Sequence, residues 1–191
     1  MIDLSVVILA GGPSTRLGVS KQMIRYRDET LIAQSCRRAL QLSQTVTVIS
    51  GANRHSVEAE AHKFKVDVVY NPDWEQGLAS SLALAVKHEF NCNRLLLMNC
   101  DQPLVPMLHY QSLVQKSNDQ QDKIIATETN DRYWLPAVFP HRLFYELTTL
   151  KEDETPIQLI ESHLTELSSL PCPQAAFSID SPDDMRRLRE S

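Results

Sequence analysis

The stretch VVILAGGPSTRLGVSKQ, residues 6–22, decides the fold of this chain. Its apolar start, rich in Val and Ile, predicts a buried strand over residues 4–10. A glycine pair ends that strand, and Arg16, Gly18 and Lys21 follow in the same loop. Because ligands of open α/β sheets lie beyond the carboxyl ends of the strands, we expect this loop to hold a ligand.

The composition of the loop favours a polyphosphate ligand. Glycines let a backbone approach a ligand closely and expose N–H groups to anions. Arg16 offers a planar fork for phosphate oxygens, and Lys21 offers a mobile point charge. A P-loop is excluded because Gly18 is not followed by Lys, and the G-x-G-x-x-G spacing of dinucleotide sites does not occur.

Strand-like and helix-like patterns alternate along the rest of the chain. Further strands are expected over residues 45–50, 66–70, 94–99, 123–127, 135–139 and 175–179. Helices are expected over residues 31–42, 54–64, 78–90, 106–116, 143–150, 156–164 and 182–190, the first capped by Thr30. No linker divides the chain, so the pattern predicts a single three-layer α/β/α domain over residues 1–191 with a mixed, mostly parallel sheet.

Bulk properties exclude several classes of function. The formal net charge of −5 and the absence of a basic stripe argue against a nucleic-acid partner. No apolar run is long enough for a membrane span or has the basic start of a signal peptide. The four cysteines are far apart and form no CxxC pair, which indicates neither disulfides nor structural zinc. We therefore expect a cytoplasmic protein.

Two carboxylates follow predicted strands and are candidate metal ligands. Asp101 comes directly after the apolar run of residues 94–99, where a carboxylate is costly unless it is exposed, hydrogen-bonded or metal-bound. Magnesium suits such a place, since it takes one or two carboxylates together with phosphate oxygens. Each has a plainer interpretation: Asp101 as the start of a turn before Pro103, and Asp180 as the start of a helix before Pro182.

The segment LAGGPSTRLGVSKQ resembles the L-A-[GA]-G-x-S-x-R-x-G-x-x-K-[QA] motif of nucleotidyltransferases with the GT-A-like fold, the nucleotide-diphospho-sugar transferase type. The branch it most resembles joins a cytidylyl or guanylyl group to molybdopterin. The resemblance implies that Arg16 and Lys21 are catalytic and contact phosphates. It also implies further nucleotide contacts by Leu9, Ala10, Gly11, Gly12 and Ser14.

Three later segments extend the resemblance. DQP at residues 101–103 resembles the family's D-x-P element, which implies that Asp101 is catalytic and holds Mg²⁺. FSIDSPDDM resembles a near-terminal element and implies a second metal contact at Asp180. NPDWEQGLASSL resembles a cytidylyltransferase pattern and implies nucleotide binding by Gly77 and Ser81, whereas we expect Trp74 to pack in the core.

The implied reaction moves a nucleoside monophosphate from an NTP to the phosphate of molybdopterin. Gly11 favours GTP, whereas Gln22, the Gly77–Ser81 pattern and DQP favour CTP, which we choose. Residues 131–157 depart from the family pattern where the acceptor binds, although Tyr133 and Trp134 could stack on a flat ring. A sugar-phosphate or other small-phosphate nucleotidyltransferase and a non-catalytic nucleotide-binding protein therefore stay open. A recipient molybdoenzyme or chaperone is an expected partner.

Overall fold

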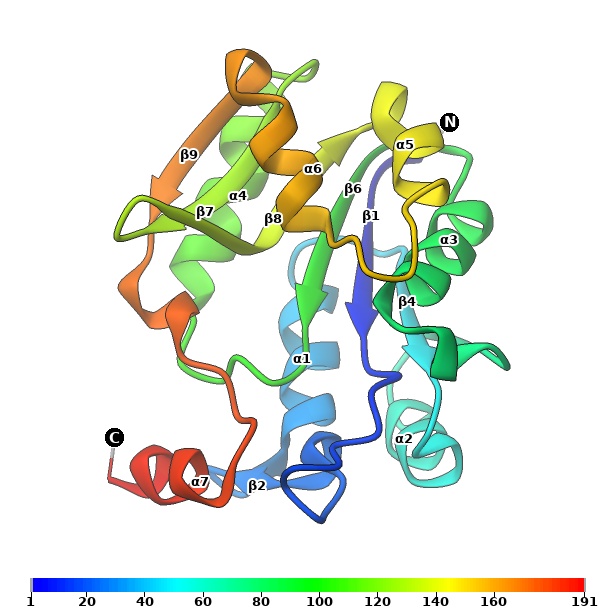
Figure 1. Cartoon of the computed structure of the whole chain (residues 1–191), viewed down its shortest axis with the longest axis vertical. Helices are drawn as coiled ribbons and strands as arrows, with labels where there is room; N and C mark the ends of the chain where they lie inside the picture. Colours follow the sequence, from blue (N-terminus) through cyan, green and yellow to red (C-terminus); the bar gives the residue numbers. More distant parts are fainter. Residues whose placement is uncertain (1, 191) are drawn as a thin grey trace.

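Seven strands form one sheet through the middle of the molecule, in the order β5-β4-β1-β6-β8-β7-β9 (Figure 1). The structure is a computed structural model that describes residues 2–190. Strand β8 runs antiparallel to both of its neighbours, and the other neighbouring pairs are parallel. The strands are β1 (Ile2–Leu9), β4 (Val46–Ser50), β5 (Asp67–Tyr70), β6 (Cys92–Asn99), β7 (Ile124–Thr129), β8 (Arg132–Pro140) and β9 (Leu167–Pro171). The predicted mixed, mostly parallel sheet is confirmed.

Strand β1 shows why the molecule has three layers. Successive side chains of a strand point to opposite faces of the sheet. Val6 and Ile8 accordingly join the apolar core on one face, and Val7 and Leu9 join the core on the other. Because residues 6–9 of β1 are apolar on both faces, the sheet must be covered on both sides, and burying this apolar surface stabilises the fold.

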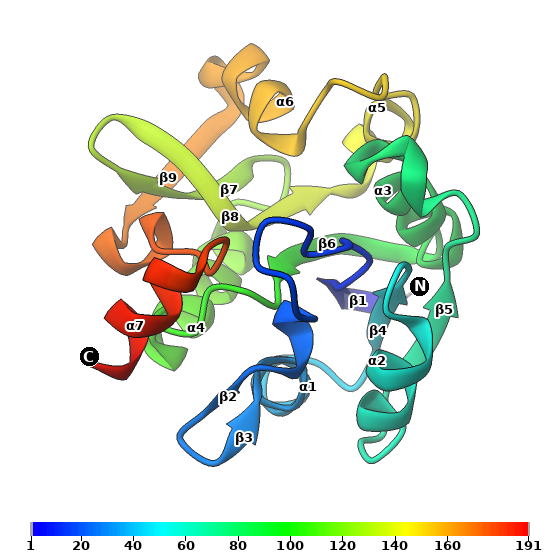
Figure 2. The same ribbon diagram turned by 60° about the horizontal axis from the view of Figure 1, so that its bottom comes forward.

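Helices cover both faces of the sheet (Figures 1 and 2). Side chains of α1 (Leu31–Leu40), α2 (Arg54–Ala61) and α4 (Met107–Asp119) complete the core on the face of Val6. Side chains of α3 (Leu78–His88), α5 (Phe144–Thr148) and α6 (Pro156–Ser162) complete the core on the face of Val7. Thr30 caps α1 as predicted, its hydroxyl accepting from the Ala33 N–H at 3.2 Å.

A third, smaller apolar cluster joins the ligand loop to the end of the chain. Leu188 of α7 (Pro182–Arg189) packs there with Leu17, Leu31 and Ile179. This cluster brings the segment before α7 under the loop that follows β1. None of the helices described in residues 2–190 is both long and apolar enough to cross a membrane.

The prediction of a last strand over residues 175–179 was wrong. The segment instead holds a short 3-10 turn, η5 (Pro173–Ala176), and β9 is the last strand. Ala175 and Ile179 are buried, but they pack in different clusters, and the Ile179 N–H donates to the Asp101 carbonyl at 3.0 Å rather than to a sheet neighbour. The two-residue strands β2 (Arg25–Tyr26) and β3 (Glu29–Thr30) were not predicted.

Candidate active site

The loop after β1 is folded back on itself so that Lys21 faces the sheet. Ser14 adopts a positive φ of 58°, and its carbonyl accepts from the N–H groups of Leu17 and Gly18. The Ser14 hydroxyl then accepts from the Lys21 N–H at 3.1 Å, where the 3-10 turn η1 (Lys21–Met23) begins. The serine of the motif therefore shapes the loop through its side chain.

Gln22 fastens the glycine pair to this turn. Its side chain is fully buried, and its amide nitrogen donates to the carbonyls of Ala10 at 2.9 Å and Gly12 at 3.0 Å. The amide oxygen accepts from the Ser20 hydroxyl at 2.8 Å. Gln22 thus holds the shape of the loop, a role that sequence reasoning missed when it used Gln22 only as an indicator of the base.

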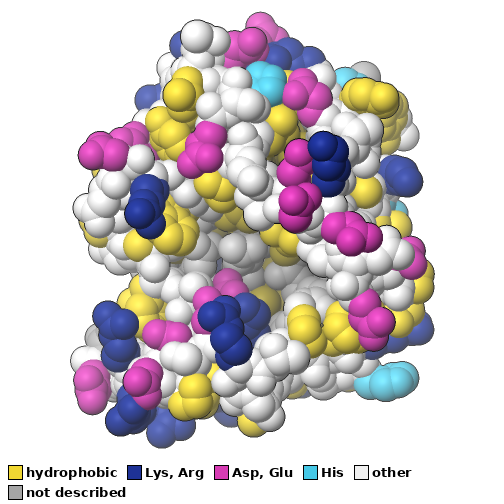
Figure 3. All heavy atoms as spheres, viewed as in Figure 1, with side chains coloured by type: hydrophobic (Ala, Val, Ile, Leu, Met, Phe, Trp, Pro, Cys, Tyr) yellow, Lys and Arg dark blue, Asp and Glu magenta, His cyan; other side chains and the backbone are white. Residues whose placement is uncertain are grey.

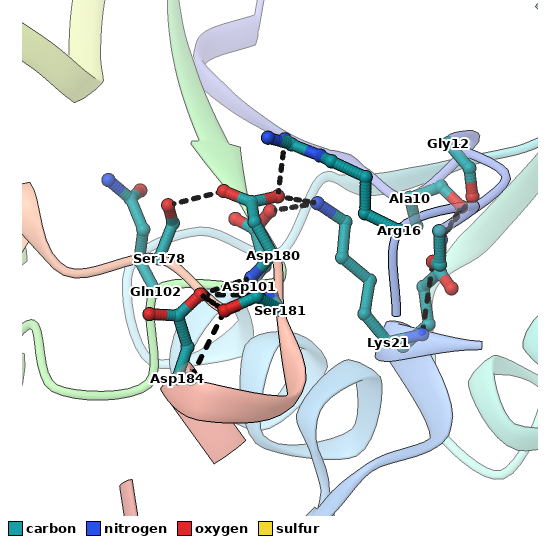
Figure 4. A network of polar contacts seen from close by, with 12 residues as sticks. Ala10, Gly12, Arg16, Lys21, Asp101, Gln102, Ser178, Asp180, Ser181 and Asp184 are labelled. Carbon is teal, nitrogen blue, oxygen red and sulfur yellow. Dashed lines mark hydrogen bonds and ion pairs between the residues drawn. The ribbon is translucent and has the colours of Figure 1, made fainter. Parts of the chain in front are cut away.

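Lys21 joins two carboxylates that are distant in the sequence (Figure 4). Its ammonium pairs with Asp101 Oδ2 through a short hydrogen bond and with Asp180 Oδ1 at 3.2 Å. Arg16 reaches the same Asp180 oxygen at 3.7 Å from the more exposed side. The structure therefore brings together the predicted catalytic residues Arg16, Lys21 and Asp101 and the predicted metal contact Asp180.

Charges within the cluster shift the pKa values of Lys21 and Asp180. Burial by itself would lower the pKa of Lys21, but the charge and hydrogen bond of Asp101, with smaller contributions from neighbouring groups, raise it above its ordinary value. Burial would raise the pKa of Asp180, and hydrogen bonds from Ser178 and Lys21 with the charges of Lys21 and Arg16 lower it. Lys21 is accordingly cationic and Asp180 anionic at neutral pH.

Asp101 has an oxygen that is prepared for a further ligand. The residue is only 8% exposed, and its Oδ1 atom is buried without a hydrogen-bond partner in residues 2–190. An unpaired buried carboxylate oxygen is costly and indicates a missing partner. Two hard carboxylates that converge on one cation fit a magnesium-type ion completed by phosphate oxygens. The described residues offer no cluster of three or more metal-ligating side chains, so these two carboxylates are the candidate ligands.

Glycine packing fixes the position of the loop. A Cβ atom at Gly51, just after β4, would come within 2.4 Å of the Gly11 carbonyl oxygen and 2.8 Å of its Cα. The Ala52 N–H donates to the same carbonyl at 3.0 Å. Sequence reasoning missed Gly51, although a glycine directly after a predicted strand was a signal for close backbone approach.

Two adjoining hollows meet at the Lys21 cluster. The first is lined by residues of the glycine loop, of β6 and of α3, among them Leu9, Gly11, Gly12, Gly77, Ser81 and Asp101. The second is lined by Ser14, Arg16, Lys21 and Asp180, among others. Figure 3 shows the hollowed face, with basic side chains beside acidic ones at its lower rim. Ala10 lines neither of these two hollows. Its carbonyl accepts a hydrogen bond from the Gln22 side chain and so helps to hold the loop.

The structure corrects the expectation that Trp74 packs in the core. Trp74 lies in the 3-10 turn η2 (Trp74–Gln76), is partly exposed and lines the first hollow. Trp134 instead packs against the core on the Val6 face, and Tyr133 packs against the opposite core. Both aromatic residues of the expected acceptor region are thus engaged in packing.

Comparison with known proteins agrees with this geometry. The family model described as "MobA-like NTP transferase domain" matches residues 6–167, which run from β1 to the start of β9. This chain belongs to the MobA-like NTP transferase family. The family resemblance read from the motifs is confirmed, and the three-layer fold is that of GT-A-like nucleotidyltransferases.

Two curated relatives are named as enzymes of the molybdenum cofactor. A "Molybdenum cofactor cytidylyltransferase" of Escherichia coli (strain K12) is 26% identical over 120 residues, which are 62% of this chain and 62% of the relative. A "Probable molybdenum cofactor guanylyltransferase" of Peptoclostridium acidaminophilum is 27% identical over 164 residues, or 84% of this chain and 66% of the relative. The matches therefore span less than two thirds of the length of these relatives.

Solved structures extend the similarity to the whole chain. Rv0371c from Mycobacterium tuberculosis H37Rv has a TM-score of 0.83 and 27% identity, with 100% of both chains covered. A manganese complex of that protein has a TM-score of 0.77 and 26% identity, with 99% of both chains covered. A structural neighbour of this chain has thus been solved with manganese.

Proposed function

We propose that this chain transfers a nucleoside monophosphate from an NTP, CTP in preference, to the terminal phosphate of molybdopterin and releases pyrophosphate. The observation that carries the proposal is the convergence of Lys21 and Arg16 on Asp101 and Asp180 beside the glycine loop. Family membership and the names of the curated relatives support it. Because the site draws on residues from Leu9 to Asp180, we take residues 1–191 as one functional domain.

The proposed reaction brings two anions together. An oxygen of the acceptor phosphate forms a bond to the α-phosphorus, and the bond from that phosphorus to the leaving pyrophosphate breaks. Lys21 and Arg16 stabilise the negative charge that develops at phosphorus and on pyrophosphate. A phosphate monoester is already ionised near neutral pH, so the attacking oxygen needs no strong base from the protein.

Asp101 and Asp180 are the residues that would hold Mg²⁺. The buried, unpartnered Oδ1 atom of Asp101 and the convergence of both carboxylates on Lys21 support this assignment. Bound Mg²⁺ would supply positive charge to the triphosphate oxygens. Lys21, freed from the carboxylates, would then be available to the phosphates in the same hollow.

The preference for CTP rests on Gln22, the Gly77–Ser81 pattern and DQP at residues 101–103, and the segment around α3 shows how the base could be selected. Gly77 and Ser81 line the first hollow together with Gly11, and a Cβ atom at Gly11 would approach the Ser81 hydroxyl to 3.3 Å. The residue at position 11 and Ser81 therefore determine jointly how far a base can enter. Gln22 also lines this hollow, and its amide nitrogen is engaged by the carbonyls of Ala10 and Gly12, so it acts on the base chiefly through the shape of the loop.

A second candidate for the acceptor is a phosphate compound smaller than molybdopterin. Trp134 packs against the core, and it does not offer a free platform for a flat pterin ring. The loop between α5 and α6 also lies close to the start of α3, since a Cβ atom at Gly77 would meet the Glu152 carbonyl oxygen at 3.3 Å. This crowding favours a smaller phosphate, such as a sugar phosphate, as the alternative acceptor. A nucleotide-binding protein without catalysis is disfavoured by the Lys21–Asp101 pair.

Pyrophosphate release tests the proposal directly. Purified protein is mixed with Mg²⁺, CTP or GTP, and either molybdopterin or a panel of sugar phosphates. We expect CTP and molybdopterin to give the fastest release, and Lys21→Ala and Asp101→Ala to slow it by about a hundredfold or more. If either variant released pyrophosphate at a rate within about twofold of wild type, the assignment of the site would be contradicted. Faster release with GTP than with CTP would change the preferred nucleotide to GTP. NTP binding without turnover would favour the non-catalytic alternative.

We further propose a cytoplasmic setting and a recipient molybdoenzyme or chaperone for the product. All four cysteines are free and buried, which accords with a reducing compartment. A direct check of the partner is transfer of labelled product to an apo-molybdoenzyme in the presence and absence of this protein. Equal transfer in both cases would contradict a delivering role.

A further inference from the structure

Asn71 lies behind the first hollow, where β5 ends. It is only 2% exposed, and its backbone N–H donates to the Ser50 carbonyl at 3.0 Å, which anchors it to the end of β4. A buried amide side chain is retained in a folded protein when it is hydrogen-bonded. The partners of this side chain therefore indicate what it does.

The orientation of the Asn71 amide follows from its contacts. The backbone N–H of Asp73 donates to Oδ1 at 3.0 Å, and an N–H group can only donate, so this atom is the oxygen. The amide nitrogen therefore faces α3. It donates to the hydroxyl oxygens of Ser80 and Ser81, each at 2.9 Å.

The two serines differ in what happens to their hydroxyl protons. The Ser80 hydroxyl lies 2.8 Å from each of the carbonyl oxygens of Asp73 and Gly77, so its proton has an acceptor. The Ser81 oxygen accepts from Asn71, and its proton meets no acceptor in residues 2–190. Ser81 also lines the first hollow, so its hydroxyl is left to donate to a ligand there.

We propose that Asn71 is a positioning residue that fixes Ser81 as a hydrogen-bond donor to an acceptor atom on the nucleoside part of the NTP. This inference rests on the proposed function. Besides Lys21 and Asp101, the hollow of Ser81 carries the apolar side chains of Trp74 and Leu78, whereas Arg16 and Ser14 line the second hollow. We therefore assign the nucleoside part of the NTP to the first hollow. Asn71 does not line either hollow and acts through Ser81.

Asn71→Asp inverts the polarity of this contact with almost no change of shape. A carboxylate accepts at both oxygens, so the Ser81 proton would turn away from the hollow toward residue 71. Loss of one buried hydrogen bond predicts a Kd for the NTP that is roughly tenfold higher. Binding of inorganic tripolyphosphate with Mg²⁺ should stay unchanged, because that probe has no nucleoside. In turnover the KM for NTP should rise while kcat is retained.

Matched variants separate this role from a structural one. Ser80→Ala removes the other hydroxyl that Asn71 contacts and should leave NTP binding near that of wild type. Ser81→Ala should weaken NTP binding as Asn71→Asp does. The double variant Asn71→Asp/Ser81→Ala should bind NTP no more weakly than Ser81→Ala alone, because both changes remove the same hydrogen bond to the ligand.

Calorimetric titration of the better of CTP and GTP, and of tripolyphosphate, reports the outcome. If wild type binds neither probe, the proposed function fails. If wild type binds both but Asn71→Asp and Ser81→Ala bind NTP as wild type does, or lose tripolyphosphate equally, this inference fails. Should the buried carboxylate unfold Asn71→Asp, Asn71→Ala replaces it and should weaken NTP binding without affecting tripolyphosphate.

Discussion

Lys21 and Asp101 lie 80 residues apart in the sequence, and their side chains form a short ion pair at the floor of the site. The same ammonium contacts Asp180 at 3.2 Å. The Lys21 ammonium therefore compensates the charge of both carboxylates. Under the proposed assignment of Asp101 and Asp180 as metal ligands, this ammonium and the metal would compete for one position.

This arrangement predicts competition between Lys21 and a divalent metal. Lys21→Met leaves two converging carboxylates without their ammonium, so Mn²⁺ should bind more tightly without nucleotide than it does to wild type. Loss of the ion pair should also lower the free energy of unfolding by about 1–3 kcal/mol in metal-free buffer, and added Mn²⁺ should restore part of it. Titration followed by Mn²⁺ paramagnetic resonance measures the affinity.

The matched control is Asp101→Asn in the Lys21→Met background. This change removes the most buried ligand of the pair and should abolish the gain in Mn²⁺ affinity. Equal Mn²⁺ affinity of wild type and Lys21→Met, within about twofold, would contradict a shared position for the ammonium and the metal.

Gly51→Ala tests the close packing of the glycine loop. The added Cβ would lie 2.4 Å from the Gly11 carbonyl oxygen, so the loop must move. We expect a loss of about 1–3 kcal/mol in the free energy of unfolding and weaker NTP binding. Gly12→Ala is the control for stability, because a Cβ atom there meets nothing within 4 Å. Equal stability of the two variants in urea denaturation would refute the packing argument.

Gln22→Glu tests the clamp on the glycine pair. The substituted carboxylate would face the carbonyls of Ala10 and Gly12, which accept hydrogen bonds and cannot donate. We expect roughly a tenfold weaker NTP affinity or more, together with a lower Tm. Gln111→Glu on the exposed face of α4 is a control for the added charge. An unchanged Kd for NTP in Gln22→Glu would mean that the clamp does not shape the site.

Local sequence patterns correctly predicted those elements whose signals lie within a few consecutive residues. The apolar run of β1, the Thr30 cap and the glycine loop were all visible in the sequence, because propensity, capping and backbone freedom act over a few residues. The strand β9 was missed because its sequence LSSLP carries two serines and a proline. Its polar residues are tolerated since it is an edge strand.

Contacts between segments distant in the sequence could not be predicted from such local patterns. Asp180 was expected to follow a strand, yet the Ile179 N–H bond to the Asp101 carbonyl brings it to the site. The packing of Gly51 on Gly11 likewise joins two loops that only the finished sheet brings together. The motifs therefore identified the charged groups, whereas the tertiary structure was needed to find the residues that hold them in position.

A buried histidine predicts how stability depends on pH. His109 of α4 is 7% exposed, and its Nε2 atom lies 2.8 Å from the Thr127 hydroxyl, which donates in turn to the Pro136 carbonyl at 2.6 Å. Because the Thr127 proton goes to that carbonyl, Nε2 is the donor in its contact with Thr127. Burial lowers the pKa of His109 below its ordinary value of 6.5.

The sign of the effect follows from proton uptake. The unfolded chain binds a proton at His109 at a higher pH than the folded chain, so the contribution to stability is complete above about pH 6.5 and is lost as pH falls toward the lowered pKa. His109→Gln keeps an N–H donor for Thr127 without titrating, and it should flatten the fall in the free energy of unfolding between about pH 7 and pH 5. Urea denaturation at several pH values measures this, with the exposed His55→Gln as the control. A pH dependence unchanged by His109→Gln would show that His109 does not take up the proton on unfolding.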